Sequence, residues 1–459
     1  MQLKLSEHYN YKKLLRFTLP TILGLVVTSI YGVVDGFFLS NFAGKLSFAA
    51  VNFIMPYTLI LTSIGYMMGS GSSALIAKTI GQKRPDQARK LLTGLFVVSL
   101  ILGIGTSLAG RALLNPVLDL MGCTPALRQD AYTYALILLA FLPCSMIQMY
   151  FQTIFVTAAR PLHNFVITLC AGVLNIFLDW LMVGTLDWGA AGAACATGLG
   201  QSMAALLSLV FFVKPMAGKG ENALYFCRFT ITAREVGSAM VNGMSELFTN
   251  AATSIISILY NFQLLRFAGE NGVAAYGTLM YVSMIFMAVS IGYSIGVSPL
   301  VSYQYGAASH QELSSLLKKS LVILLIGAVS MFGLAELLAE PLASLFAGYD
   351  PELMDLTIQA FRCCSPVFLF SGFAIFGSSF FTALNNGPVS AAISLIRTLV
   401  FQIGFILIFP LFWGLNGVWF SMVAAEAMAV VITAFLVYRF RHQYGYFKTG
   451  WNFIQKFAF

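Results

Sequence analysis

Three polar side chains lie inside stretches that are otherwise apolar. Asp35 stands in the run LPTILGLVVTSIYGVVDGFF, and Asn175 and Asp179 stand in a second run of similar character. The spacing of four residues places Asn175 and Asp179 on one face of a helix. Two carboxylates that share a dry pocket cannot both ionise cheaply, so such a pair invites a proton or a hard cation such as Na+. These residues indicate an ion-binding site in apolar surroundings.

The rest of the chain has the composition of a membrane protein. Of its 459 residues, 58% are hydrophobic and 10% are charged, and its mean hydropathy is +0.82. Soluble domains contain about 25% charged residues, and a helix needs about 20 apolar residues to cross a membrane. An aspartate inside such a helix costs roughly 2.5–3.5 kcal/mol, so its presence points to a functional role. The pattern predicts an all-α polytopic membrane protein with twelve transmembrane helices, near 14–39, 48–77, 91–110, 131–157, 163–184, 190–213, 236–264, 273–303, 319–337, 357–384, 389–411 and 417–438.

Lysine and arginine residues gather on one side of the predicted helices. With the N-terminus inside, about twenty of them fall in inside segments and about five in outside segments. Such residues are retained on the cytoplasmic side, so we expect both termini in the cytoplasm and the protein in the cytoplasmic (inner) membrane. This distribution explains the net charge of +8, so nucleic acid is not an expected partner.

Two further segments are predicted to lie against membrane lipid. They are residues 82–90, which we expect to form a short interfacial helix, and the C-terminal tail.

Short motifs occur twice, once in each half of the chain, at one constant offset. Phe42-Ala-Gly44 returns as Phe267-Ala-Gly269, and Trp188-Gly189 returns as Trp413-Gly414. A repeat of this length is a duplicated half, and an even number of helices in each half makes the halves parallel. We therefore expect two six-helix bundles, related by a pseudo-twofold axis along the membrane normal, that rock between two openings. The expected parts are an N-terminal lobe (1–213), a cytoplasmic linker (214–235), a C-terminal lobe (236–438) and a cytoplasmic tail (439–459).

Five further polar residues lie in the predicted helices. Thr197 and Gln201 repeat the four-residue spacing, which suits either a cavity wall or hydrogen bonds between helices worth roughly 0.6–2 kcal/mol. Glu246 either contacts a cationic substrate or is hydrated near the cytoplasmic mouth. Glu426 aligns with Gln201 in the repeat and is another candidate cavity residue. Arg397 must pair with an acid or with backbone carbonyls, which favours a structural role.

Several motifs in this order resemble the multidrug and toxic compound extrusion (MATE) transporters over essentially the whole chain. No single motif is specific, but their order and spacing together are. The motifs are Leu19-Pro20 leading to Val34-Asp35-Gly36, Ile80-Gly81-Gln82-Lys83-Arg84, the Asn175/Asp179 pair, Trp-Gly-x-x-Gly at 188 and 413, and Arg397.

The chain is similar to MATE members whose cation site lies in the N-terminal half. In this resemblance Pro20 matches the proline at which the first helix bends, and Tyr134 matches a tyrosine that lines the same cavity. Other members use a glutamate and an aspartate of the C-terminal half. Glu246 matches that glutamate, but the predicted helix at 361–384 contains no acid, so this second site looks incomplete. The resemblance also implies a monomer. The coupling residues that it implies, which could hold H+ or Na+, are Asp35, Asn175, Asp179 and Thr197.

These features predict a secondary antiporter that exports organic, cationic or amphipathic drugs or metabolites in exchange for H+ or Na+. The chain has no GxxxxGK[ST] loop for ATP and no HExxH motif or serine nucleophile elbow, so we expect no enzyme activity and no cofactor or metal beyond the coupling ion. One alternative is a flippase for lipid-linked oligosaccharides, which needs cationic residues along the cleft, whereas the predicted helices offer little besides Arg397. Another is a membrane protein without a transport role, which would need a reactive group of residues that the sequence lacks.

Overall fold

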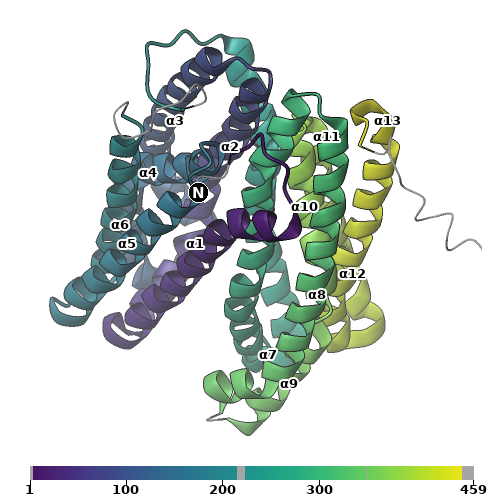
Figure 1. Ribbon diagram of the computed structural model, residues 1–459. Helices are drawn as coiled ribbons and strands as arrows, with labels where there is room; N and C mark the ends of the chain where they lie inside the picture. The colour runs from purple at the N-terminus through teal and green to yellow at the C-terminus, as the bar shows by residue number, and fades with distance from the viewer. Residues whose placement is uncertain (1–3, 214–222, 349, 447–459) are drawn as a thin grey trace, which may run out of the picture.

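The two halves of the chain lie side by side as helical bundles. The computed structural model describes residues 4–213, 223–348 and 350–446, and the regular secondary structure of these residues is helical. In Figure 1 the first half runs from purple to teal and the second from green to yellow. Residues 214–222 of the expected linker and 447–459 of the expected tail lie outside the described residues.

Six long helices form the N-terminal half. Local signals explain where they begin, because the Asn10 side chain caps the first, and a proline opens the third, fourth and fifth. Two helices continue into π-helical turns, which are frequent at functional sites. The elements are α1 (Tyr11–Phe38), η1 (Leu39–Ala43), α2 (Gly44–Gly81), α3 (Pro85–Leu120), α4 (Pro125–Thr157), α5 (Pro161–Asp179), η2 (Trp180–Thr185) and α6 (Gly189–Phe211).

The C-terminal half repeats this plan with different element lengths. They are α7 (Ala233–Gly306), α8 (His310–Ala347), α9 (Pro351–Cys364), α10 (Val367–Ala383), α11 (Gly387–Leu395), η3 (Ile396–Gln402), α12 (Ile403–Arg439) and α13 (Arg441–Tyr444). Thr232 and Glu235 form a capping box at the start of α7. Gly269 (φ +62°) breaks α7, and Gly414 (φ +53°) breaks α12.

The duplicated motifs account for these breaks. Gly44 (φ +87°) and Gly189 (φ +54°) are the repeat equivalents of Gly269 and Gly414, and all four have a positive φ. Glycine adopts such a conformation without the clash that a Cβ atom would cause. The Phe-Ala-Gly and Trp-Gly motifs are therefore turns at equivalent places in the two halves.

The described helices make twelve crossings, as predicted. Nine are long and apolar enough to span a membrane, and α9 with α10, bent by 49°, makes a tenth span. Two of these ten, α7 and the unit α11–η3–α12, are each divided at a glycine, which gives twelve. The predicted single segment 357–384 is the bent pair, because Pro366 has no N–H to continue the helix. The prediction of a separate interfacial helix at 82–90 is wrong, because α3 runs without a break from Pro85.

Two glycines mark the pseudo-twofold axis. A Cβ atom at Gly81 of α2 would lie 2.2 Å from the carbonyl oxygen of Tyr303, and one at Gly306 of α7 would lie 2.1 Å from that of Lys78. The two glycines occupy equivalent positions of the repeat, and so do the residues that carry the two carbonyls. The contact therefore maps onto itself when the halves are exchanged.

The close contact continues along α2 and α7. A Cβ atom at Gly71 would lie 1.9 Å from the carbonyl oxygen of Ala239, and one at Gly243 would lie 1.9 Å from that of Met67. Any side chain larger than hydrogen would have to push these backbones apart. The halves therefore pack backbone to backbone here.

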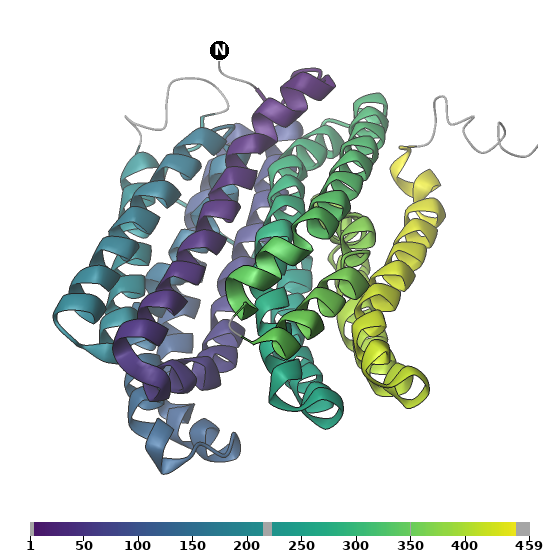
Figure 2. The same cartoon turned by 90° about the horizontal axis from the view of Figure 1, so that it is seen from below.

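A segment before α1 fastens the N-terminal half to the C-terminal half. We call residues 5–9 the N-terminal strap, and the end of the bundle that carries both described chain ends the terminal face (Figure 2). Leu5 and Tyr9 are buried among side chains of the C-terminal half. His8 Nδ1 lies 2.7 Å from the Glu312 carboxylate, and Lys319 Nζ donates to the carbonyl oxygen of Tyr9 at 2.5 Å.

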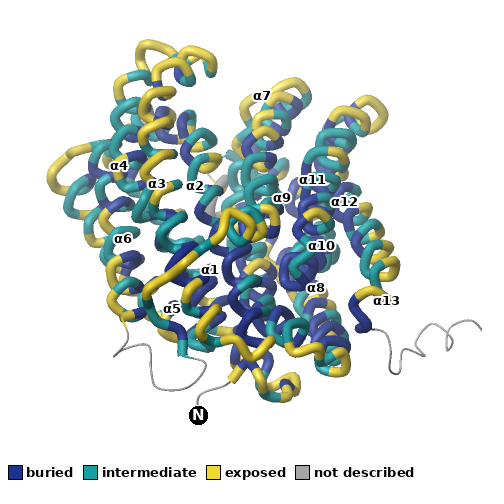
Figure 3. Tube along the Cα trace, turned by 90° about the horizontal axis from the view of Figure 1, so that it is seen from above, coloured by how far each residue is buried: buried dark blue, intermediate teal, exposed yellow. Residues whose placement is uncertain are grey.

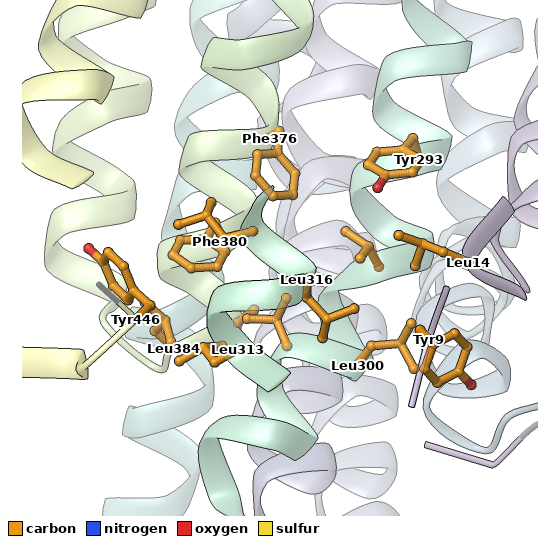
Figure 4. Close-up of a cluster of buried hydrophobic side chains, with 14 of the residues drawn as sticks. Tyr9, Leu14, Tyr293, Leu300, Leu313, Leu316, Phe376, Phe380, Leu384 and Tyr446 are labelled. Carbon is orange, nitrogen blue, oxygen red and sulfur yellow. The ribbon is translucent and has the colours of Figure 1, made fainter. Parts of the chain in front are cut away.

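The start of the C-terminal tail packs into the same cluster (Figure 4). Asn386 Nδ2 donates to the Tyr444 hydroxyl at 2.9 Å, and the Tyr446 hydroxyl donates to the carbonyl oxygen of Val437 at 2.7 Å. The ring of Tyr446 packs edge-on against Phe380. The prediction that the tail lies on the membrane surface is wrong for its described part, because these rings are buried inside the protein.

Burial follows the expected membrane environment. Large apolar side chains such as Ile101 (62% exposed) and Leu337 (76% exposed) cover the outer faces of the helices, where lipid would solvate them. Buried stretches gather around α10 and its neighbours in Figure 3. The interior therefore holds both the packing core and the polar residues.

We predict that Gly306→Leu opens the terminal face. The added side chain would force α2 and α7 apart at a contact that tolerates no Cβ atom, and overpacking of this kind costs about 1–3 kcal/mol. A cysteine at Ala74, which is buried and accepts a hydrogen bond from Asn385, should then react with a thiol reagent about tenfold faster.

The matched control for this experiment is Gly277→Leu. Gly277 lies in the same helix with nothing within 4 Å of an added Cβ atom. The labelling is measured on purified protein whose native cysteines have been replaced. Equal rates in the two leucine variants would contradict the close contact.

Candidate functional site

The acid pair forms where α1 lies beside α5. Asp35 belongs to the last turn of α1, and Asp179 is the last residue of α5, directly before η2. Their carboxyl groups lie within hydrogen-bonding reach of each other. Two ionised carboxylates repel each other and neither can donate, so the pair is stable only when it shares a proton or a cation. The structure thus brings together two acids that lie far apart in the sequence.

Asn175 and Thr197 extend the site towards α6. Asn175 lies one turn before Asp179, and its Nδ2 donates to Thr197 Oγ1 at 3.5 Å, a long bond. Together with Gln201 and Tyr31 they line a cavity of about 10 Å³. This volume is close to the lower limit for one water molecule. The cavity adjoins the acid pair through Asn175, but neither Asp35 nor Asp179 lines it.

The oxygens of the site lack donors. Among the described residues, Oδ1 of Asp35, both carboxylate oxygens of Asp179 and Oδ1 of Asn175 are buried without a donor partner. Asp179 is 0% exposed. An unsatisfied buried polar group costs about 1–3 kcal/mol, and a charged one costs more. The arrangement is suited to a proton or a small hard cation that these oxygens would share.

Three tyrosines surround the acid pair. Tyr134 of α4, which the sequence analysis named, is buried near both carboxyl groups. Tyr31 lines the cavity beside Asn175, and the hydroxyl of Tyr281 of the C-terminal half would lie 3.6 Å from a Cβ atom at Gly36, the neighbour of Asp35; neither tyrosine was predicted. The four-residue spacing from Tyr31 to Asp35 could have identified Tyr31. The sequence carries no comparable signal for Tyr281, because the packing of the two halves brings it there.

Pro20 lies within an unbroken α1. The helix runs from Tyr11 to Phe38 with Pro20 inside it. Because proline has no N–H, the carbonyl of Arg16 loses its helical partner, which weakens the helix at this turn. The hinge role of Pro20 stays a prediction.

A second charged cluster lies in the C-terminal half. Arg397 Nε donates to both carboxylate oxygens of Glu426, at 2.9 and 3.0 Å, and Gln402 Nε2 donates to Oε1 at 3.4 Å. Arg397 and Glu426 are 8% and 2% exposed. Glu246 of α7 interacts electrostatically with Arg397. The structure therefore groups Glu246, Glu426 and Arg397, which the sequence analysis treated one by one.

Twelve crossings in two equivalent halves, with charged residues gathered inside, define a multi-pass membrane transporter. The sequence profile of the MatE family matches residues 20–181 and again residues 247–408, together more than half of the chain. The chain belongs to the MatE family, whose members are transporters and not enzymes. The profile thus matches once in each half, in agreement with the duplicated motifs.

Two curated relatives are similar over almost their full length. The multidrug export protein MepA of Staphylococcus haemolyticus (strain JCSC1435) is 20% identical over 95% of both chains. MepA of Staphylococcus aureus (strain MSSA476) is 19% identical over 94% of both chains.

Solved structures share the fold. A MATE crystal structure in complex with MaL6 superposes with a TM-score of 0.89 at 24% identity, over 96% of this chain and 98% of that chain. An outward-facing multidrug resistance MATE transporter gives a TM-score of 0.88 at 24% identity over the same shares. A transporter from Pyrococcus furiosus, described as having a binding pocket of reverse polarity, gives 0.88 at 23% identity over the same shares.

We predict that Gly172→Ala disturbs the site and lowers thermal stability. An added Cβ atom at Gly172 would lie 2.9 Å from Cδ1 of Tyr31, so the ring must move. Overpacking costs about 1–3 kcal/mol, which exceeds the gain of about 0.5–1 kcal/mol from replacing a helical glycine.

Gly105→Ala serves as the control for this prediction. Nothing lies within 4 Å of a Cβ atom at Gly105 of α3, so only the stabilising effect on the helix should remain. Thermal unfolding of the purified variants should therefore shift in opposite directions. A shift in the same direction would contradict the packing of Tyr31 on Gly172.

Proposed function

We propose that the protein is a secondary antiporter that exports organic, cationic or amphipathic drugs and metabolites in exchange for H+ or Na+. The observation that carries the proposal is the pair Asp35 and Asp179, in which three of the four carboxylate oxygens are buried without a donor among the described residues. A buried carboxylate pair is stable only with a positive charge to share, and it releases that charge when water enters. The names of the curated relatives, multidrug export proteins, support drugs as the cargo.

The energy of one ion suffices for useful export. Moving one charge through 100 mV supplies about 2.3 kcal/mol, and about 1.4 kcal/mol corresponds to a tenfold gradient. One ion that crosses roughly 150 mV can therefore sustain a gradient of roughly a few hundredfold in a neutral substrate. Asn175 and Thr197 add oxygen ligands to the acid pair, which suits either ion.

The packing at the terminal face supports alternating access. The halves touch there through Gly81 and Gly306, so an opening towards that face requires this contact to separate. The distribution of basic residues favours the terminal face as the cytoplasmic one, with both termini inside the cell. In that orientation the present arrangement is closed to the cytoplasm. A bend of α1 at Pro20 would couple the ion to this motion.

Residues near the charged cluster are proposed to meet the substrate. Glu426 is already bound by Arg397, so Glu246 is the acid available to a cationic substrate. Tyr134 and Gln201 would line the cavity on the other side. We further propose that lobes 1–213 and 236–438, with linker 214–235 and tail 439–459, work as a monomer in the cytoplasmic membrane.

The flippase alternative receives no support from this arrangement. A lipid pyrophosphate would require a cation free to bind it. Arg397 is held at both oxygens of Glu426 and is surrounded by acids. The antiporter is therefore the function that the described residues favour.

We predict that Asp35→Asn and Asp179→Asn each abolish gradient-driven efflux. The amide cannot bind and release the ion, so transport of ethidium should fall to the level of empty vesicles. The measurement uses protein reconstituted in lipid vesicles, with pH and sodium gradients imposed separately, which also identifies the ion.

Asp355→Asn is the control for this experiment. Asp355 lies exposed on α9 and makes no ion pair among the described residues. This variant should pump like the unaltered protein. Efflux at the unaltered rate in both acid variants of the pair would refute the proposal.

A further inference from the structure

The two halves neutralise their buried acids in different ways. In the N-terminal half two carboxyl groups face each other, whereas in the C-terminal half Glu426 is bound by Arg397. In the repeat, Glu426 is the equivalent of Gln201, and Arg397 is the equivalent of Gly172. Equivalent positions thus carry a glutamate and an arginine in one half, and a neutral amide and a glycine in the other. The arginine–acid pair belongs to the C-terminal half alone.

Arg397 is the cation that contacts Glu426. Among the described residues its hydrogen bonds use Nε and both go to the Glu426 carboxylate, at 2.9 and 3.0 Å. The guanidinium is charged under all conditions in which the protein folds. The positive charge beside Glu426 therefore cannot leave, because it is part of the chain.

The other groups that face Glu426 are neutral. Gln402 donates a single hydrogen bond, at 3.4 Å, from η3. The Tyr260 hydroxyl of α7 interacts with Glu426 electrostatically but is bonded to Ser421 at 2.8 Å. The charge on Glu426 is thus balanced by Arg397 and by nothing else among these neighbours.

We propose that Arg397 is a tethered cation that fills, in the C-terminal half, the role that an exchangeable ion fills in the N-terminal half. Only the acid pair of the N-terminal half then exchanges an ion during transport. The comparison with an exchangeable ion rests on the proposed function. Whether Arg397 alone neutralises Glu426 can be tested without measuring transport. Removing the guanidinium should turn Glu426 into a second ion site.

The test counts protonated carboxyl groups by infrared spectroscopy. The purified full-length protein is held at neutral pH in a sodium-free buffer. Arg397→Met should gain the carbonyl stretch of one protonated carboxyl group, because Glu426 loses its cation and stays buried. A pH jump should show the corresponding gain of one bound proton per protein.

Two variants separate this effect from general damage. Arg397→Met/Glu426→Gln removes both charges, so it should fold and lack the new signal. Arg397→Lys keeps a cation and should also lack it. If Arg397→Met does not fold, Arg397→Gln, which keeps an amide donor for Glu426, takes its place in the same comparison.

The outcomes decide between the inference and the proposed function. A spectrum of Arg397→Met equal to that of the unaltered protein would overturn the inference, and so would a new signal that persists in the double variant. Loss of efflux in Asp35→Asn together with either result leaves the antiporter and removes the tethered cation. Unchanged efflux in Asp35→Asn with a new Glu426 signal removes the antiporter and keeps the tethered cation.

Discussion

A carboxyl group buried away from water needs a positive charge or a proton beside it, and the described structure depends on that constraint. Asp35 and Asp179 meet from α1 and α5, and Oδ1 of Asp35 and both carboxylate oxygens of Asp179 have no donor among the described residues. Apolar helices provide the dry surroundings, and π-helical turns directly after α5 and near the end of α1 set the place where the acids meet. Such a site is costly when it is empty, and a proton or cation that entered it would lower that cost.

The duplication of the chain did not produce two equal sites. Glycines with positive φ and the self-matching contact of Gly81 with Gly306 keep the two halves alike in backbone. The polar interiors differ, because Arg397 stands where the first half has Gly172. The room left by that glycine is taken by the ring of Tyr31. One backbone plan therefore supports two neighbouring carboxyl groups in one half and an arginine–glutamate pair in the other.

The sequence predicted the features that a single segment reveals. An acid inside an apolar run stands out by its cost, so Asp35 and Asp179 were found, and the turn motifs at Gly269 and Gly414 were visible as repeats. Features that arise from packing between distant segments could not be predicted from the sequence. The partner of Arg397 lies on another helix, and Tyr281 reaches Asp35 from the opposite half. The bend at Pro366 was missed because the apolar pattern continues across it.

The N-terminal strap has a consequence for how the protein is made. Leu5 and Tyr9 share one hydrophobic cluster with Tyr444 and Tyr446, so nearly the first and nearly the last described residues complete the same core. Contacts between such remote segments form late, since the whole intervening chain must be ordered first. The N-terminal strap is synthesised long before the helices of the C-terminal half against which it packs. This hydrophobic cluster is therefore complete only after Tyr444 and Tyr446 have been synthesised.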